Sequence, residues 1–297
     1  MNYGDKGIKQ KKKLLNSATT KLGTKLGIFF IKLALVGIIA LVVAGSCLVF
    51  GSFQGIIENA PDIASINVSP EGFATKIYDS DENEIQTLSS AGANRTYVTL
   101  DQIPKDLQHA FIAIEDERFY EHNGIDMRGI LRAASITLSS GEMSQGASTI
   151  TQQLLKNNVF NAFNESTIEK IKRKVQEQYL AIKLETVMSK DAILENYLNT
   201  INLGNGYYGV QSAARGYFNK DVSELSISEC AVIASITKSP TGLNPIRHAD
   251  RNKDRQSQVL LNMKEQGYIS QEEYDEAVSD DVYASCLLYT SPSPRDA

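Results

Sequence analysis

Glu115 has neighbours that could make it a general acid or base. It follows Phe111 by four residues and Ile112 by three, and it precedes Phe119 by four, so on a helix all of them would share its face. Apolar surroundings disfavour the ionised form of a carboxyl group and so suit it to proton transfer. The spacing predicts acid–base chemistry at Glu115, although an ordinary half-exposed glutamate is the simpler interpretation of composition alone.

Glu177 has cationic neighbours instead. Arg173 and Lys174 precede it by four and three residues, so they would lie on its side of a helix. Their charges would keep the carboxylate ionised, and the run 170–177 could bind a diphosphate. A solvated run of charges on a helix surface is the alternative.

A third segment, residues 146–157, is dense in hydroxyl and amide side chains at an expected helix start. Such groups suit hydrogen bonding to a sugar or a phosphate. A capped helix with a solvated polar face is the alternative interpretation. The residues concerned are Ser148, Thr149, Gln152, Gln153, Lys156 and Asn157.

Other chemical motifs are weak. Ser235 and Lys238 have S-x-x-K spacing, but the S-x-N and K-[ST]-G motifs of a penicilloyl-serine or lactamase site do not follow. The His residues at 109, 122 and 248 lack ligand spacing, so no metal site is predicted. The sequence contains neither a Walker loop nor G-x-G-x-x-G.

The elements that must position these residues are mostly helices. After Pro104, residues from Leu107 to Arg118 recur at spacings of three and four, which predicts a helix. Capping-box spacing occurs at 226–229 and 270–273. Further helices are predicted at about 126–138, 148–158, 166–187, 189–199, 208–218, 226–237, 251–266 and 270–279. With 74–78 and 84–88 flanking a polar turn as a hairpin, a mainly α domain is predicted.

An apolar stretch near the N-terminus predicts one membrane span. The next ionisable residue after Lys32 is Glu58, and a helix of this length exceeds a hydrocarbon core of about 30 Å. A long span after a basic tail favours an uncleaved signal anchor at 33–53 over a cleaved signal peptide. Because eight Lys lie within 1–32, these residues are expected in the cytoplasm and 58–297 outside a single-pass plasma-membrane protein.

Composition limits the remaining possibilities. With 42% apolar residues a packed core is expected, and the net charge of −5 despite the basic tail argues against nucleic-acid binding. Three Cys define no disulfide framework. Residues 54–72 are expected to be a connector, and 286–297, with two Pro and no helical period, a junction scar or truncation.

Five motifs in order resemble glycosyltransferase family 51, the peptidoglycan glycosyltransferase module of class A penicillin-binding proteins and monofunctional transglycosylases. The matching stretches are EDERFYEHNG at 115–124, GASTITQQLLKN at 146–157, RKVQE at 173–177, KDAILENYLN at 190–199 and GYYGVQSAARGYF at 206–218. The resemblance implies a peptidoglycan glycosyltransferase domain at 73–280. The family is similar in fold to lysozyme, which implies a mainly α, lysozyme-like domain with a small β-hairpin, preceded by one transmembrane helix.

The resemblance also implies a role for each glutamate. Glu115 would take the proton from the 4-hydroxyl of the acceptor, lipid II, as that oxygen attacks the donor's anomeric carbon with inversion. The donor would be the growing glycan chain on undecaprenyl diphosphate. Glu177 would assist the departing diphosphate directly, through a water or through a divalent cation (Mg or Mn); no cofactor is required.

Further residues follow from the same motifs. Arg173 and Lys156 would be positive partners of the diphosphate. The family has Arg in some members where this chain has Glu169, and Lys where it has Gln176, so the phosphate contacts are less well defined than the two glutamates. The substrate-binding set is Asp116, Phe119, His122, Ser148, Thr149, Gln152, Gln153, Lys156, Asn157, Arg173 and Lys174.

Alternatives remain at this level. The family occurs alone or fused to a transpeptidase domain, and the ending of the chain favours the N-terminal part of a bifunctional class A penicillin-binding protein over a monofunctional enzyme. A membrane-anchored hydrolase or lytic transglycosylase is the enzymatic alternative, because two carboxylates can also flank a glycosidic bond. An inactive scaffold is the third. The implied partners are lipid II, the growing glycan chain, the membrane, and proteins of cell-wall synthesis or division.

Overall fold

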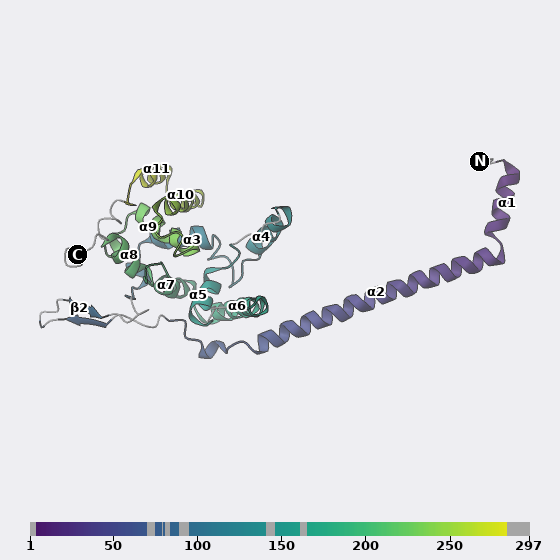
Figure 1. Ribbon diagram of the computed structural model, residues 1–297, viewed down its shortest axis with the longest axis horizontal. Coiled ribbons are helices and arrows are strands. Elements are labelled where there is room, and N and C mark those ends of the chain that lie inside the picture. The colour runs from purple at the N-terminus through teal and green to yellow at the C-terminus, as the bar shows by residue number, and fades with distance from the viewer. Residues whose placement is uncertain are drawn as a thin grey trace. The chain divides into compact units, whose positions relative to one another are not determined.

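The computed structural model describes residues 4–69, 75–78, 80, 84–88, 95–140, 146–160 and 165–283 (Figure 1). The chain forms two compact units, residues 1–59 and residues 60–297. The predicted tail at 286–297 and the end of the predicted connector, 70–72, lie outside the described residues.

The N-terminal unit consists of α1 (Asp5–Leu15) and α2 (Ala18–Glu58). Among the described residues, one segment, Leu22–Ser65, is long and apolar enough to cross a membrane, and it contains most of α2. Side chains along it, such as Leu41 and Leu48, are exposed, as on a helix whose solvent is lipid. The helix runs to Glu58, so the prediction of a connector from residue 54 was wrong at its start; Pro61, which lacks an N–H, follows the helix end.

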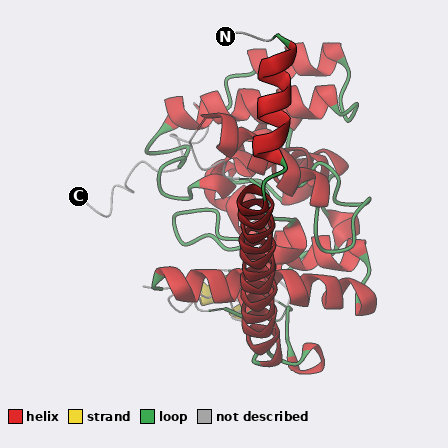
Figure 2. Ribbon diagram, turned by 90° about the vertical axis from the view of Figure 1, so that its right-hand side faces the viewer, coloured by secondary structure: helices red, strands yellow, loops and turns green. Residues whose placement is uncertain are grey.

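The C-terminal unit is built mainly of helices (Figure 2), as predicted. Its elements are η1 (Ile63–Ser65), β1 (Thr75–Tyr78), β2 (Glu84–Leu88), η2 (Leu100–Gln102), α3 (Lys105–Glu115), α4 (Met127–Ser140), α5 (Ile150–Asn158), α6 (Thr167–Val187), α7 (Lys190–Thr200), α8 (Val210–Phe218), η3 (Val222–Glu224), α9 (Ile227–Ser235), η4 (Ile236–Lys238), α10 (Ala249–Glu265) and α11 (Gln271–Ser279).

The two strands pair antiparallel, from Thr75 opposite Leu88 to Tyr78 opposite Glu84. Most of the turn that would join them, 79 and 81–83, lies outside the described residues. The hairpin as a complete element therefore stays a prediction.

Two groups of helices enclose one apolar core. Helices α3, α9, α10 and α11 pack together, α5 packs against α6 and α7, and α8 contacts both α7 and α9. The core contains the wholly buried side chains of Leu107, Phe111, Leu154, Tyr197, Ile233 and Met263. The site described below lies where α3 of the first group meets α5 of the second.

Side-chain caps fix where the helices begin. Both predicted capping boxes are present, from Ser226 to Glu229 and from Ser270 to Glu273. Another box precedes α6, where Ser166 accepts from the Glu169 N–H and Glu169 accepts from the Ser166 N–H. Glu169, which departs from the family pattern, therefore serves as a helix cap.

Helix α3 is shorter than predicted. It ends at Glu115 instead of continuing through Arg118, because Asp116 leaves the helical conformation, with φ of −158° and ψ of 69°. The Asp116 carboxylate accepts hydrogen bonds from the Ile150 N–H and from His122 Nε2, both at 2.9 Å. These bonds hold Asp116 away from the helix direction, so Phe119 is not a helical neighbour of Glu115.

Candidate active site

Glu115, the last residue of α3, is half-buried and holds two hydrogen bonds. Its Oε2 accepts from Gln153 Nε2 at 2.8 Å, and its Oε1 accepts from Thr237 Oγ1 at 2.5 Å. These two polar partners were not predicted, and Phe111, Ile112 and Phe119, the apolar neighbours expected from the spacing, are buried in the core. The two donors fix the orientation of the carboxylate, and only the ionised form of such a group can accept a proton.

Tyr197 on α7 supports this arrangement from inside the core. Its hydroxyl donates to Gln153 Oε1 at 3.2 Å, which turns the amide so that Nε2 faces Glu115. Complete burial, with the nearby charges of Glu115 and Asp116, raises the pKa of Tyr197 well above its usual value. The phenol therefore remains a neutral donor.

Glu177 on α6 is buried, with 1% of its surface exposed, and is surrounded by cations. Arg173 Nη1 forms an ion pair with Oε1, and Lys174 Nζ lies 3.0 Å from Oε2. These two ion pairs confirm the predicted cationic neighbours of Glu177. They also compensate the cost of burying its charge. Lys174 Nζ also donates to Ser148 Oγ at 2.8 Å and to Gln152 Oε1 at 3.3 Å.

Glu165 was not predicted from the sequence, yet it shares Arg173 with Glu177. Arg173 Nε lies 2.8 Å from Glu165 Oε1. The hydrogen bond to Glu165 and the charge of Glu177 raise the pKa of Arg173. Glu165 stands in the loop before α6, where no helical spacing relates it to Arg173, so sequence periodicity gave no signal for this pair.

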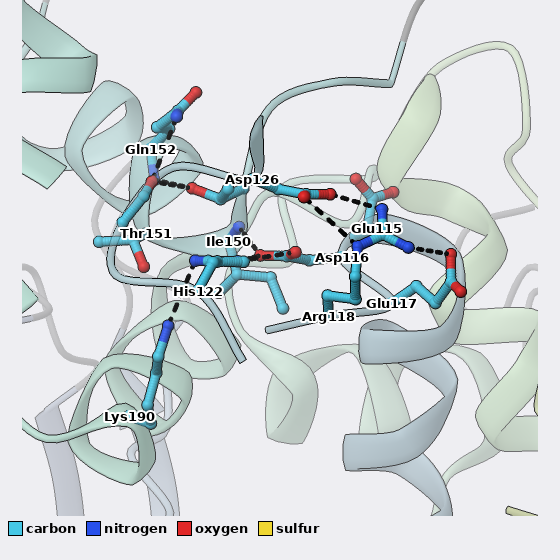
Figure 3. A network of polar contacts seen from close by, with 12 residues as sticks. Glu115, Asp116, Glu117, Arg118, His122, Asp126, Ile150, Thr151, Gln152 and Lys190 are labelled. Carbon is cyan, nitrogen blue, oxygen red and sulfur yellow. Dashed lines mark hydrogen bonds and ion pairs between the residues drawn. The ribbon is translucent and has the colours of Figure 1, made fainter. Parts of the chain in front are cut away.

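Asp116 and His122 support the site through contacts within the protein (Figure 3), and Phe119 does so through its contact with Lys190. His122 bridges Asp116 and Lys190, whose Nζ lies 3.4 Å from His122 Nδ1. The same Nζ lies 4.5 Å from the centre of the Phe119 ring, a cation–π distance. Since Asp116 also accepts from the Ile150 N–H, this network ties the end of α3 to the start of α5. Direct contact of these three residues with substrate stays a prediction.

Thr149 and Gln152 are also buried, each at 1% exposure, and both bond to Gly124 O. Gly124 has φ of +83°, and a Cβ there would lie 2.5 Å from the carbonyl carbon of Ala181. Only glycine therefore allows this close approach. Of the other residues predicted in this segment, Ser148 is half-buried beside Lys174, while Lys156 and Asn157 are exposed in the last turn of α5.

A hollow of about 490 Å³ opens beside Glu115. It is lined by Glu115, Glu117, Arg132, Gly146, Asn262 and Gln266, among others. A second hollow borders Glu115 and Ser148. The carboxylate of Glu115 is thus held by the protein at a wall that a ligand can reach.

The residues around Glu177 do not fit a divalent cation. Within the described part of the chain, no cluster of three or more His, Cys, Asp or Glu side chains could hold a metal ion. Both Glu177 oxygens already face Arg173 or Lys174, and a metal at that carboxylate would lie against these two cations. The cation suggested by the family resemblance therefore has no role in the chemistry derived below.

Comparison with known proteins identifies the family. Residues 81–264 match the family model described as Transglycosylase. Because this match covers more than half of the chain, the chain belongs to the transglycosylase family, as the five motifs predicted. Its relatives place it more narrowly, with the transglycosylase domains of penicillin-binding proteins.

Three relatives illustrate the relationship. Penicillin-binding protein 1A of Escherichia coli is 41% identical over 89% of this chain and 31% of its own length. Penicillin-binding protein 1F of Bacillus subtilis is 44% identical over 67% of this chain and 27% of its own length. The crystal structure of penicillin-binding protein 1A from Haemophilus influenzae, 26% identical, covers 71% of this chain and 21% of that chain with a TM-score of 0.39.

The family assignment rests on the sequence matches. The chain spans about a third or less of the length of these relatives. The similarity to penicillin-binding protein 1A and the apolar helix α2 together indicate a membrane-anchored protein.

Proposed function

We propose that this chain is a peptidoglycan glycosyltransferase that joins lipid II to a growing glycan chain and releases undecaprenyl diphosphate. The observation that carries the proposal is the separation of two glutamates into two environments on one scaffold. Glu115 has two neutral donors and borders a hollow, whereas Glu177 is buried between two cations. Such a pair divides proton transfer from leaving-group stabilisation.

Helix α5 connects the two environments. Gln153 bonds to Glu115, and its neighbour Gln152 bonds to Lys174, which in turn pairs with Glu177. The proton acceptor and the cationic group are therefore positioned by adjacent residues of one helix. This arrangement suits a reaction in which a hydroxyl loses its proton while an anionic group leaves.

In the proposed reaction, Glu115 accepts the proton of the 4-hydroxyl of lipid II. The electron pair of that O–H bond forms the new bond to the anomeric carbon of the donor. The bond from this carbon to the diphosphate breaks, and its electrons leave with the diphosphate. Attack on the face opposite the leaving group inverts the anomeric configuration.

Glu177 acts on the leaving group through its partners. A carboxylate would repel a diphosphate that approached it directly, whereas Arg173 and Lys174 attract it. We therefore assign the charge stabilisation to these cations, with Glu177 as the residue that positions them. Lys156 and Asn157, exposed on α5, are available for further contacts with the substrate.

The wider assignment rests on the relatives and on charge. We propose the glycosyltransferase domain at 73–280, the Lys-rich N-terminus in the cytoplasm and the domain on the outer face of the plasma membrane. Because the relatives are penicillin-binding proteins about three times as long, we also propose that the intact protein is a bifunctional class A enzyme. Cell-wall synthesis or division proteins are its proposed partners.

The test is incubation of the detergent-solubilised chain with lipid II, followed by gel separation of the products. A ladder of glycan chains is expected, and Glu115→Gln should lower its formation by about 10²- to 10⁴-fold with an unchanged melting curve. Glu121→Gln is the matched control, because Glu121 lies in the same segment with an exposed side chain. Release of fragments from finished peptidoglycan without chain growth would favour the hydrolase alternative instead.

A further inference from the structure

The stretch with S-x-x-K spacing contains a residue that reaches Glu115. Ser235 is completely buried and donates to Ala231 O at 2.6 Å, so its hydroxyl serves the helix. Thr237, two residues later in η4, points its hydroxyl at Glu115 Oε1. The proposed reaction leaves this contact without a function.

Thr237 has two acceptors for one proton. Its Oγ1 lies 2.5 Å from Glu115 Oε1 and 2.9 Å from Ala234 O. A hydroxyl carries one hydrogen and two lone pairs, so it donates to one of these oxygens at a time. While Glu115 is ionised, the charged oxygen is the stronger acceptor.

Protonation of Glu115 reverses this preference. A carboxyl O–H at Oε1 can donate to Thr237 Oγ1, and the Thr237 hydrogen then turns to Ala234 O. Gln153 cannot respond in this way, because its Nε2 carries only hydrogens and its Oε1 is engaged with Tyr197. Thr237 can therefore either donate to Glu115 or accept from it, whereas Gln153 can only donate.

We propose that Thr237 is a positioning residue for the general base, whose hydroxyl holds Glu115 Oε1 when ionised and accepts a hydrogen bond from it when protonated. The inference rests on the proposed function of Glu115. The proton moves from the acceptor hydroxyl of the substrate to the Glu115 carboxylate, and Thr237 exchanges hydrogen-bond direction without losing its own proton. Only the Thr237 hydroxyl has to rotate when Glu115 gains or loses its proton.

Three other titratable groups lie near Glu115 and bear on its pH dependence. Arg255 on α10 interacts electrostatically with Glu115, and burial lowers the pKa of this arginine from its usual high value. Tyr197 on α7 remains neutral, and Asp116 is the adjacent carboxylate on the same segment. These groups are the same in a Thr237 variant, so a change in pH dependence reports the lost hydroxyl.

The test is the kinetics of Thr237→Val and Thr237→Ser with lipid II over a range of pH. Valine keeps the shape and removes the hydroxyl, so kcat should fall about 10- to 100-fold with little change in KM. Loss of a donor to the carboxylate should also move the acidic edge of the rate profile upward. Serine should restore both properties.

Thr200→Val is the matched control, because Thr200, like Thr237, donates to a helix carbonyl, Asn196 O at 2.8 Å, and valine there is at least as demanding for folding since Thr200 is buried. It should leave the acidic edge unchanged. A wild-type rate and acidic edge in Thr237→Val, or equal damage in Thr237→Ser, would overturn the inference; if the valine variant fails to fold, Thr237→Ala provides the same comparison. Absence of glycan synthesis by the wild type, or activity of Glu115→Gln, would instead overturn the proposed function.

Discussion

Gln153 donates a 2.8 Å hydrogen bond from Nε2 to Oε2 of Glu115 and so joins the second turn of α5 to the end of α3. The start of α5 is itself held by Asp116, the residue after Glu115, through the Ile150 N–H. Two contacts from consecutive residues of one segment thus fix the position of this helix relative to the carboxylate. The proposed base is positioned by backbone and side-chain bonds together.

We predict that Gln153→Leu lowers kcat by about 10- to 100-fold, because the charged carboxylate loses a hydrogen-bond donor and its fixed orientation. Initial rates with lipid II and a thermal melting curve measure the effect. Gln258→Leu is the control, since Gln258 is an exposed amide on α10 that donates to Asn262 of the same helix. Equal rates for both variants would show that Gln153 does not position the base.

Glu177→Gln should reduce turnover less than Glu115→Gln, because diphosphate is a good leaving group and both cations remain. Arg173→Ala should weaken donor binding as well as turnover, since a guanidinium can hold phosphate oxygens in a bidentate way. Rates over a range of lipid II concentrations separate the two effects: altered affinity alone reports uniform binding, and altered kcat reports transition-state stabilisation. If Glu177→Gln and Arg173→Ala both had wild-type kinetics, the diphosphate would not bind at these two residues.

Glu165 pairs with Arg173, one of the two cations of the proposed diphosphate site. Arg173 Nε lies 2.8 Å from Glu165 Oε1, so a diphosphate bound to Arg173 would be repelled by this nearby carboxylate. Glu165→Gln removes the competing charge, so we predict a KM for lipid II several-fold lower at low salt, with the gain reduced by added salt. A raised KM would indicate instead that Glu165 holds Arg173 in its binding position.

Short-range patterns predicted most of the fold. The helix periodicity and the capping boxes depend on residues three or four apart, and the structure reproduces them from α4 to α11. The pairing of Arg173 and Lys174 with Glu177 was predictable for the same reason. These interactions are encoded within one helix.

The surroundings of Glu115 could not be predicted in this way. Its donors come from Gln153 and Thr237, 38 and 122 residues later in the chain. Periodicity placed Phe119 on its face because it did not foresee that Asp116 leaves the helix to bind the Ile150 N–H, 34 residues away. The donors to Glu115 and the early end of α3 both depend on tertiary contacts, and helix spacing carries no information on such contacts.

The proposed topology predicts the outcome of proteolysis. A protease added outside intact cells should digest residues 58–297 and spare the Lys-rich N-terminus, because eight Lys disfavour transfer across the membrane. Antibodies against tags at the two ends would follow the fragments, with permeabilised cells as the control in which both ends are digested. Protection of the large unit, or a mature chain starting near residue 47, would contradict the topology.

Acid should weaken the C-terminal unit through Asp126. Arg118 forms a two-bond ion pair with this carboxylate, with Nη2 to Oδ2 at 2.6 Å, and its hydrogen bonds lower the pKa of Asp126 below the usual value. The folded state then binds fewer protons than the unfolded state, so this stabilisation is present above about pH 4 and is lost as pH falls through the folded pKa.

We therefore predict that Asp126→Asn lowers the free energy of unfolding at neutral pH by about 1–3 kcal/mol, and that the difference from wild type shrinks below about pH 4. Urea unfolding of the solubilised chain at several pH values measures both. Asp254→Asn, which changes an exposed carboxylate on α10, should have little effect at either pH. A difference between Asp126→Asn and wild type that stays constant from neutral to acid pH would show that the variant disturbs packing rather than the ion pair with Arg118.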